Sequence, residues 1–162
     1  MDPPMRPTVY LETTILSYLT ARPSRDLVTA ARQEVTRTWW ETRRARFDCH
    51  ISRVVLDECG QGDPDAASRR LDALRGLPSL AMNPETARFA AALIQRGLIP
   101  AKAADDALHI AVSALNGMRY LVTWNFTHIA NAEKAEDIRA FCLTMGYACP
   151  VICSPDELME NP

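Results

Sequence analysis

The chain has 162 residues, which suits one compact domain, because a chain of this length buries ~70% of the surface that its unfolded form exposes. Hydrophobic residues make up 48% and charged residues 23% of the chain, and no segment reaches the roughly 18 apolar residues that a membrane-spanning helix needs. The formal net charge of −2 excludes a protein that coats nucleic acid through bulk positive charge, although a local basic face or a bound cation can still contact phosphate.

The N-terminal residues and the cysteines bear on where the protein works. Residues 1–7 have neither the basic region nor the apolar region of a secretion signal. We expect a disordered lead over residues 1–7, a single domain over residues 8–159 and a cytoplasmic location. The five cysteines form no CxxC pair, and the three histidines are not spaced near them as zinc ligands would be, so we expect reduced structural thiols.

Strand and helix patterns alternate along the chain, separated by glycine, proline and N-cap residues. In the first half, the predicted elements are a strand at 8–11, a helix after Thr13 and Thr14, a long amphipathic helix at about 25–46, a strand at 47–51, a helix at 53–59 with Ser52 as N-cap, and a helix at 63–74. In the second half, they are a strand at 77–82, a helix at 83–97, a helix at 101–116, a strand at 120–123, a helix from Asn131 to Gly146, a strand at 151–153 and a turn at 155–159.

This alternation favours an α/β fold with a central, mostly parallel β-sheet flanked by helices. The predicted helix at 101–116 is almost wholly apolar in its second half, so we expect it to lie in the centre of the core. In such a sheet, ligands bind at the carboxyl ends of the strands. The chain has no Walker loop, GxGxxG sequence or serine nucleophile elbow.

Two glutamates are candidates for chemistry. Glu12 follows an apolar strand and directly precedes a helix, the position at which an open α/β sheet presents side chains to its cleft. The same position also suits a carboxylate that is stabilised by the positive end of the following helix, and the residue alone does not decide between the two. Glu58 lies near the C-terminal end of its predicted helix, where most glutamates are simply solvated.

Asp105 and Asp106 fall in the first turn of the apolar helix, where either acid can stabilise the helix dipole. Asp106 lies directly ahead of the buried part, and an ionised carboxylate that enters a core needs a partner, which a cation would supply. We therefore favour Asp106 as a functional residue and Asp105 as a structural one. His109 follows Asp105 by four residues, so we expect it to pair with Asp105 or to pack in the core rather than to ligate a metal.

Thr123 and Asn125 follow the clearest strand of the chain and point to the same side if the backbone stays extended. Asn125 is equally well explained as a turn residue that bonds its own backbone. Together with Glu12, Glu58 and Asp106, these side chains come from distant segments that an α/β sheet brings to one edge. Several hard oxygen ligands at one edge suit Mg²⁺ or Mn²⁺ better than zinc.

Four stretches of the chain resemble, in order and spacing, the motifs of PIN domains, and most strongly those of VapC-like toxins from bacterial toxin–antitoxin pairs. The resemblance covers about residues 8–159. The stretches are Val9–Thr14, Leu56–Glu58, Ala104–Ala111 and Thr123–Ile129.

The resemblance implies a PIN-like three-layer fold and an endoribonuclease that hydrolyses RNA phosphodiester bonds with Mg²⁺ or Mn²⁺. By motif position, Glu12, Glu58 and Asp106 match metal-binding acids of the family. Asn125 matches its fourth acid, and Thr123 matches a hydroxyl residue that supports the site. Two departures stand out, because Glu12 is one methylene longer than the family's usual aspartate and Asn125 is neutral.

The resemblance also implies a homodimer and a small antitoxin protein that covers the site. Two other functions remain open: a PIN scaffold that no longer cuts and instead binds a protein or RNA, and a hydrolase of small phosphate compounds. Arginines of the long predicted helix either contact RNA or form an ordinary solvated face; they are Arg32, Arg37, Arg43, Arg44 and Arg46.

Overall fold

A computed structural model describes residue 1 and residues 4–160 of the chain. Within them, four strands form one sheet in the order β2-β1-β3-β4, and every neighbouring pair is parallel. The strands are β1 (Thr8–Leu11), β2 (Asp48–His50), β3 (Tyr120–Val122) and β4 (Val151–Cys153). Of the predicted disordered lead, residues 2–3 lie outside the described residues, and residues 4–7 form neither helix nor strand.

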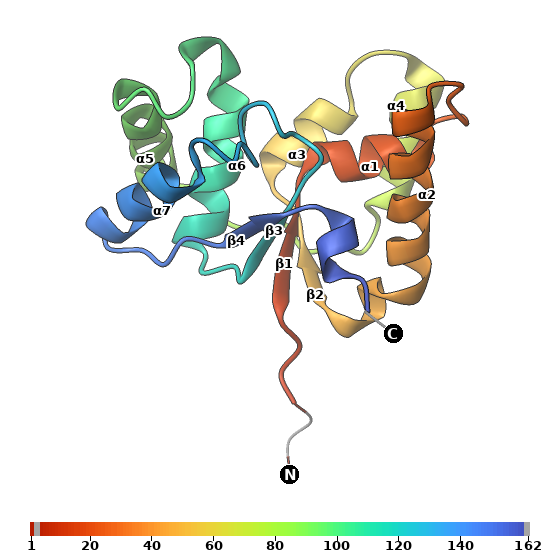
Figure 1. Cartoon of the computed structure of the whole chain (residues 1–162), viewed down its shortest axis with the longest axis horizontal. Helices are drawn as coiled ribbons and strands as arrows, with labels where there is room; N and C mark the ends of the chain where they lie inside the picture. Colours follow the sequence, from red (N-terminus) through yellow and green to blue (C-terminus); the bar gives the residue numbers. More distant parts are fainter. Residues whose placement is uncertain (2–3, 161–162) are drawn as a thin grey trace.

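Helices cover both sides of the sheet. Figure 1 shows α5, α6 and α7 on one side and α1, α2 and α4 on the other, so the predicted α/β architecture with a parallel sheet between helical layers is confirmed. The α-helices are α1 (Thr13–Thr20), α2 (Leu27–Thr42), α3 (Arg53–Cys59), α4 (Pro64–Ala73), α5 (Pro84–Gln95), α6 (Ala104–Leu115) and α7 (Ala135–Thr144). Three short 3₁₀ helices are η1 (Arg44–Arg46), η2 (Ala101–Ala103) and η3 (Pro155–Leu158). None of the helices in the described residues combines the length and the apolar character that crossing a bilayer requires.

The predicted strand at 77–82 is wrong. Only Ser79 forms a bridge in this segment, with Ile51, through hydrogen bonds from Ile51 N–H to the Pro78 carbonyl and from Leu80 N–H to the Ile51 carbonyl. Pro78 has no N–H to donate, so the ladder cannot continue through it. The segment therefore extends the sheet by one bridge instead of a strand.

Two helices fall furthest short of their predicted lengths. The long helix ends at Thr42, and η1 turns the chain into β2. The last helix begins at Ala135 instead of Asn131, because the Asn131 side chain accepts a hydrogen bond from Glu133 N–H in a turn of its own. Asparagine offers the backbone such local bonds, and they compete with helix capping.

The core lies between the sheet and both helical layers. Val9, Tyr10 and Leu11 of the central strand β1 are fully buried. The second half of α6 is buried as predicted, apart from Leu108 and Leu115, which are partly buried. The five cysteines are free thiols, and four of them are buried.

The register of the sheet determines where the strand ends meet. Leu11 pairs with Val122, and the N–H of Glu12 donates to the Val122 carbonyl over 3.1 Å. The residues that follow these two strands, Glu12 and Thr123, are therefore neighbours across the sheet. In Figure 1, β1 leads into α1 beside α3, and α3 contacts both α1 and α6, so these helices lie near the same edge.

Candidate metal centre

Glu12 is a buried carboxylate surrounded by hydroxyl and amide donors. Its Oε1 accepts hydrogen bonds from the hydroxyls of Thr123, at 2.6 Å, and Thr14, and its Oε2 accepts one from the Thr14 N–H at 3.1 Å. Only 3% of Glu12 is exposed, and this burial raises the pKa of its carboxyl group although His109 and the threonine hydrogen bonds act to lower it. Glu12 thus both caps α1 and presents a carboxylate that lacks solvent to stabilise its charge.

Glu58 and His109 form the second part of the centre. Oε1 of Glu58 lies 2.6 Å from Nε2 of His109 and accepts a hydrogen bond from the Thr13 hydroxyl at 2.7 Å. Burial acts to raise the pKa of Glu58, but the hydrogen bond and charge of His109, together with the Thr13 hydrogen bond, outweigh it and lower the pKa. Glu58 therefore favours its ionised form.

His109 has no exposed surface, and two carboxylates adjoin it. Burial acts to lower its pKa, but the hydrogen bond to Glu58 and the charges of Glu12, Glu58 and Asp106 outweigh it, so the pKa of His109 is raised. The expected position in the core is confirmed. The expected pairing with Asp105 is wrong, because the ring nitrogens contact Glu58 and Tyr10 instead.

Buried, hydrogen-bonded side chains contact the other ring nitrogen of His109, Nδ1. The Tyr10 hydroxyl lies 2.6 Å from Nδ1 of His109 and 2.8 Å from the hydroxyl of Ser52. Burial, together with the charges of Glu12 and Glu58, raises the pKa of Tyr10, so its hydroxyl stays protonated. Ser52 stands at the predicted N-cap position of α3, but its hydroxyl bonds Tyr10 and not the helix. These contacts fix the direction in which His109 presents Nε2.

Glu12, Glu58 and His109 each offer one ligand atom within 4.8 Å of the others. Two carboxylate oxygens and one imidazole nitrogen are a donor set that divalent cations accept. The set also fits on physical grounds, because a buried carboxylate such as Glu12 needs a compensating positive charge. His109, whose pKa is raised, can supply that charge in its protonated form.

Asp106 lies beside this group and not within it. Its Oδ2 is 2.8 Å from Nδ1 of His128, and the group of three with mutually close ligand atoms contains His109 in place of Asp106. Asp106 contributes to the centre through its charge, which helps to raise the pKa of His109. The structure therefore brings Glu12 and Glu58 together, as the sequence predicted, and places Asp106 outside the group of three, in contact with His128.

Thr123 and Asn125 have different positions. The Thr123 hydroxyl donates to Glu12 and accepts from the Asn125 N–H at 2.9 Å. The Asn125 side chain turns to its own loop, where Oδ1 accepts from the His128 N–H at 3.0 Å. Asn125 therefore takes the turn-forming role that the sequence left open, and it positions the backbone of His128.

A pocket of about 410 Å³ opens beside the centre. Glu58, Asp106 and His128 line it, together with Lys102 from η2 and Asp105. Lys102 gives this otherwise acidic pocket one positive charge. A larger pocket, about 760 Å³, lies elsewhere, beside β4 and α7, and contains none of the predicted site residues.

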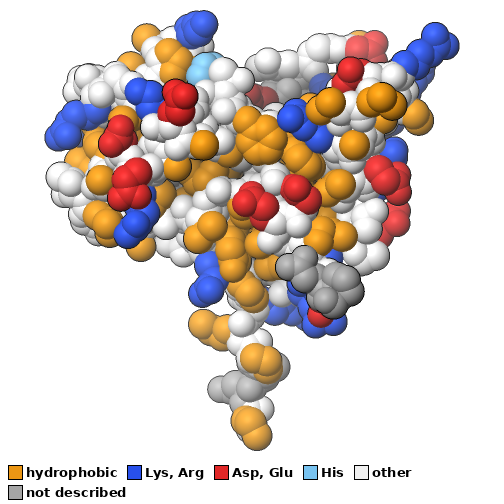
Figure 2. All heavy atoms as spheres, viewed as in Figure 1, with side chains coloured by type: hydrophobic (Ala, Val, Ile, Leu, Met, Phe, Trp, Pro, Cys, Tyr) orange, Lys and Arg blue, Asp and Glu red, His pale blue; other side chains and the backbone are white. Residues whose placement is uncertain are grey.

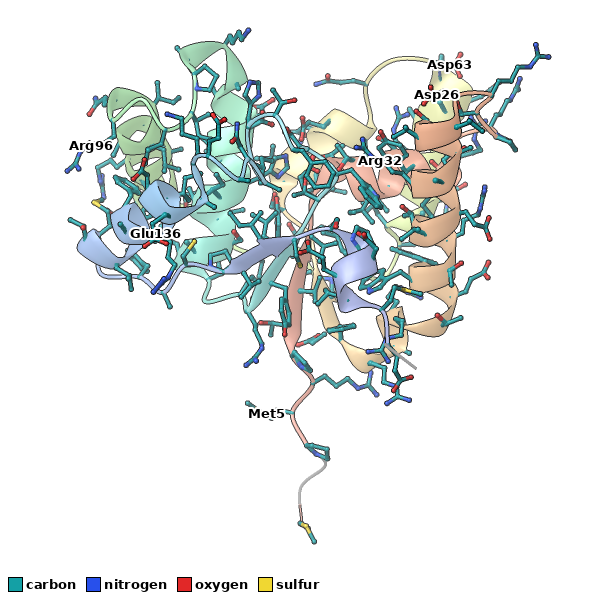
Figure 3. The ribbon with its side chains drawn as sticks, viewed as in Figure 1. Met5, Asp26, Arg32, Asp63, Arg96 and Glu136 are labelled. Carbon is teal, nitrogen blue, oxygen red and sulfur yellow. The ribbon has the colours of Figure 1, made fainter. Side chains whose placement is uncertain are left out.

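The arginines predicted for the long helix have different neighbours in the structure. Arg37 pairs with Glu34, Arg43 with Glu160, and Arg44 lies over the Trp40 ring. Arg32 lies over Trp124 and Phe126, at 5.5 and 5.1 Å from the ring centres. Figure 3 shows Arg32 reaching from α2 toward the middle of the face, and Figure 2 shows hydrophobic side chains gathered there.

Sequence reasoning missed several parts of the centre. Asp106 and His109 are three residues apart and so share a helix face, which was a signal that His109 faces the same edge as the acids. The partnership of His128 with Asp106 had no local signal, because 22 residues separate them. The sequence indicated only that a helix follows Thr13 and Thr14, but in the structure their hydroxyls bond the two glutamates.

The chain's relation to known proteins adds nothing to this geometry. No protein-family model and no curated protein matches it. The chemistry of the centre therefore has to be argued from its side chains: a buried group of two carboxylates and one imidazole that could bind a metal ion.

Proposed function

We propose that this protein is a metal-dependent endoribonuclease of the PIN, VapC-like type, which hydrolyses RNA phosphodiester bonds at the centre formed by Glu12, Glu58 and His109. The observation that carries the proposal is the mutual approach of these three ligand atoms within 4.8 Å, at the carboxyl edge of a parallel sheet, where α/β proteins bind ligands. The resemblance of the four sequence stretches to PIN motifs supplies the substrate class.

The donor set guides the choice of metal. Mg²⁺ prefers oxygen ligands alone, whereas Mn²⁺ also accepts imidazole nitrogen. Because His109 stands in the group with Glu12 and Glu58, we expect Mn²⁺ to bind more tightly than Mg²⁺. We assign these three residues as ligands, and Asp106 as the partner of His128.

The side chains divide the work between them. A bound divalent cation lowers the pKa of a coordinated water and neutralises charge on the phosphate. Thr13, Thr14 and Thr123 hold the two carboxylates in place through their hydroxyl groups. Lys102 lines the pocket with Glu58 and supplies a positive charge for the RNA backbone. In-line attack needs water and phosphate positioned together, and this rigid surrounding of hydrogen bonds serves that need.

The decisive test is an RNA cleavage assay with Mn²⁺ or Mg²⁺ on the wild type, Glu58→Gln and Glu41→Gln. Glu41 is exposed on α2, so its substitution is a control for the loss of a glutamate charge. We expect metal-dependent cleavage by the wild type and Glu41→Gln, and a loss of about 100-fold or more in Glu58→Gln. Wild-type protein that binds RNA but leaves it intact in Mn²⁺ would point to the binding scaffold instead.

The same resemblance supports a homodimer that acts as a toxin and is inhibited by a small antitoxin protein. Light scattering of the purified chain tests the dimer. Co-expression with the product of a neighbouring gene, followed by the cleavage assay, tests the inhibitor. A monomer that no neighbouring product inhibits would remove this part of the proposal and leave the nuclease activity to be judged separately.

A further inference from the structure

Arg32 of α2 lies over two aromatic side chains of the segment that follows β3 (Figure 3). Its guanidinium carbon is 5.5 Å from the centre of the Trp124 ring and 5.1 Å from the centre of the Phe126 ring, and the two rings meet edge to face at 6.0 Å. Trp124 is buried, and its indole N–H donates to the Thr36 hydroxyl at 2.8 Å. These contacts define one arrangement of the guanidinium group and both rings.

The charge of Arg32 has no ion-pair partner among the described residues. Asp26 and Asp156 lie near it, but their carboxylates accept hydrogen bonds from the Thr29 N–H and the Ser154 hydroxyl. A guanidinium group has five N–H donors, and its planar shape suits phosphate. This partly buried cation is therefore available to an anionic ligand.

Phe126 presents an aromatic ring to solvent. It is 41% exposed, whereas every other aromatic side chain in the described part of the chain is buried or partly buried. The ring also lines the pocket of about 760 Å³ beside β4 and α7, which Arg32 does not line. Pockets of about 300–1,000 Å³ hold small organic ligands. A flat group such as a nucleobase can therefore stack on Phe126 while Arg32 stays in contact with the ring.

One hydroxyl group connects the aromatic pair to the metal centre. The Trp124 N–H donates to the Thr14 hydroxyl at 2.8 Å, and the same hydroxyl donates to Oε1 of Glu12. The N–H of Phe126 in turn donates to the Trp124 carbonyl at 3.1 Å. An RNA strand with a phosphate at the centre therefore passes within reach of Phe126.

From this arrangement we infer that Arg32 and Phe126 form a nucleotide-binding subsite next to the metal centre, where Arg32 binds a phosphate of the RNA backbone and a base near the cleaved bond stacks on Phe126. The inference rests on the proposed nuclease function and deepens it, because it names residues that position the strand. Stacking on an aromatic ring accepts every base, since each base has a π-face. The subsite therefore contributes affinity for the strand and makes no choice among the four bases.

A purely structural role for these residues predicts a different outcome. Arg32 would then only cover the two rings, as long charged side chains do on apolar surface. Its substitution would lower the stability of the fold without a change in RNA binding. A protein partner that used the exposed ring of Phe126 would likewise leave RNA binding independent of this residue. Affinity for RNA therefore distinguishes the subsite from both alternatives.

The first test measures the Kd of the full chain for a short, labelled single-stranded RNA by fluorescence anisotropy, in a chelator so that the strand stays intact. Phe126→Leu keeps an apolar side chain but removes the ring, and it should raise the Kd about tenfold. Phe126→Tyr keeps the ring and should bind as the wild type does. Leu143→Ala, at an exposed apolar residue of α7, is the control. An abasic strand of the same length should bind the wild type and Phe126→Leu equally.

The second test measures the salt dependence of the same Kd. Arg32→Gln removes one phosphate contact, so the slope of log Kd against log salt concentration should fall by about 0.7, the value for one contact with a single strand. Phe126→Leu should keep the wild-type slope. Arg88→Gln, at an exposed arginine of α5 that pairs with Glu85, is the control for the loss of a positive charge. Thermal melts show that each variant is folded at the temperature of the assay.

An unchanged Kd in Phe126→Leu, or an unchanged slope in Arg32→Gln, would overturn the inference and leave the nuclease proposal intact. Equal loss of affinity for the abasic strand in Phe126→Leu would also contradict base stacking. If the wild type shows these binding differences but no metal-dependent cleavage, the nuclease proposal fails while the subsite stands as an RNA-binding site.

Discussion

Nε2 of His109 lies 2.6 Å from Oε1 of Glu58, and a metal ion bound by both atoms would displace the hydrogen that they share. A proton on His109 and a divalent cation in the centre are therefore alternatives. Metal binding and the pH dependence of stability should be linked through this one contact.

The metal-free protein should lose stability as the pH rises above neutral. The pKa of His109 is raised in the folded state. Protonation of His109 therefore stabilises the fold, fully at pH values below the pKa of the unfolded state, about 6.5 for histidine. This stabilisation is lost as the pH rises through the pKa of the folded state. Urea unfolding in the presence of a chelator from pH 6 to 9 measures this. The variant His109→Gln should lose the dependence, and His50→Gln should keep it. A wild-type curve as flat as that of His109→Gln would contradict the prediction.

Glu58→Gln should lower the stability of the metal-free protein and also remove its response to metal. The substitution keeps the shape but removes the charge that raises the pKa of His109, so we expect the metal-free fold to lose about 3 kcal/mol, as broken buried pairs do. The melting temperature should also stop responding to Mn²⁺. Thermal melts with and without Mn²⁺ measure both effects, and Glu41→Gln is the control. A full Mn²⁺ shift in Glu58→Gln would exclude Glu58 from the centre.

Much of the fold could be predicted from local sequence patterns, because strand and helix periodicity needs only neighbouring residues. The site could be predicted in part. Glu12 and Thr123 each follow a strand, and parallel strands bring such positions to one edge. The Glu58 contact with His109 could not be predicted, because it depends on how α3 packs against α6 across 51 residues of sequence. Packing of this kind has no local signal.

Tyr10→Phe should destabilise the protein although it removes only the hydroxyl group. The hydroxyl joins Ser52 to Nδ1 of His109, and its loss leaves two buried polar groups without a partner, which costs about 1–3 kcal/mol. Tyr147→Phe is the matched control, because Tyr147 is only partly buried and packs against Phe89. Urea unfolding should show a lower midpoint for Tyr10→Phe alone. Equal midpoints for the two variants would mean that the hydroxyl chain contributes nothing to stability.

Thr123→Val should weaken metal binding although it changes none of the proposed metal ligands. The Thr123 hydroxyl donates to Oε1 of Glu12 at 2.6 Å, and its loss should raise the pKa of that buried carboxyl group further and favour its neutral form. We expect the Kd for Mn²⁺ to rise about tenfold, equivalent to ~1.4 kcal/mol. Thr123→Ser keeps the hydroxyl and should restore the wild-type Kd. Calorimetric titration measures the three values, and an unchanged Kd in Thr123→Val would show that the hydroxyl does not support Glu12.

Asn125 offers the sharpest distinction between a ligand and a residue that shapes the loop. Its Oδ1 accepts the His128 N–H, and aspartate keeps that oxygen, so Asn125→Asp should retain the loop and the wild-type kcat. Asn125→Ala removes the acceptor and should cost about 1 kcal/mol of stability.

Metal titrations of these two variants show whether residue 125 is a metal ligand or only shapes the loop. A residue that only shapes the loop predicts the same Kd for Mn²⁺ in wild type, Asn125→Asp and Asn125→Ala, since none of them changes the ligands Glu12, Glu58 and His109. A new carboxylate within the ligand group would instead tighten binding, because opposite unit charges about 4 Å apart attract by ~4 kcal/mol at an effective dielectric of 20 before desolvation and repulsion from the other acids oppose it. Tighter Mn²⁺ binding in Asn125→Asp would therefore place residue 125 at the metal and contradict the loop role.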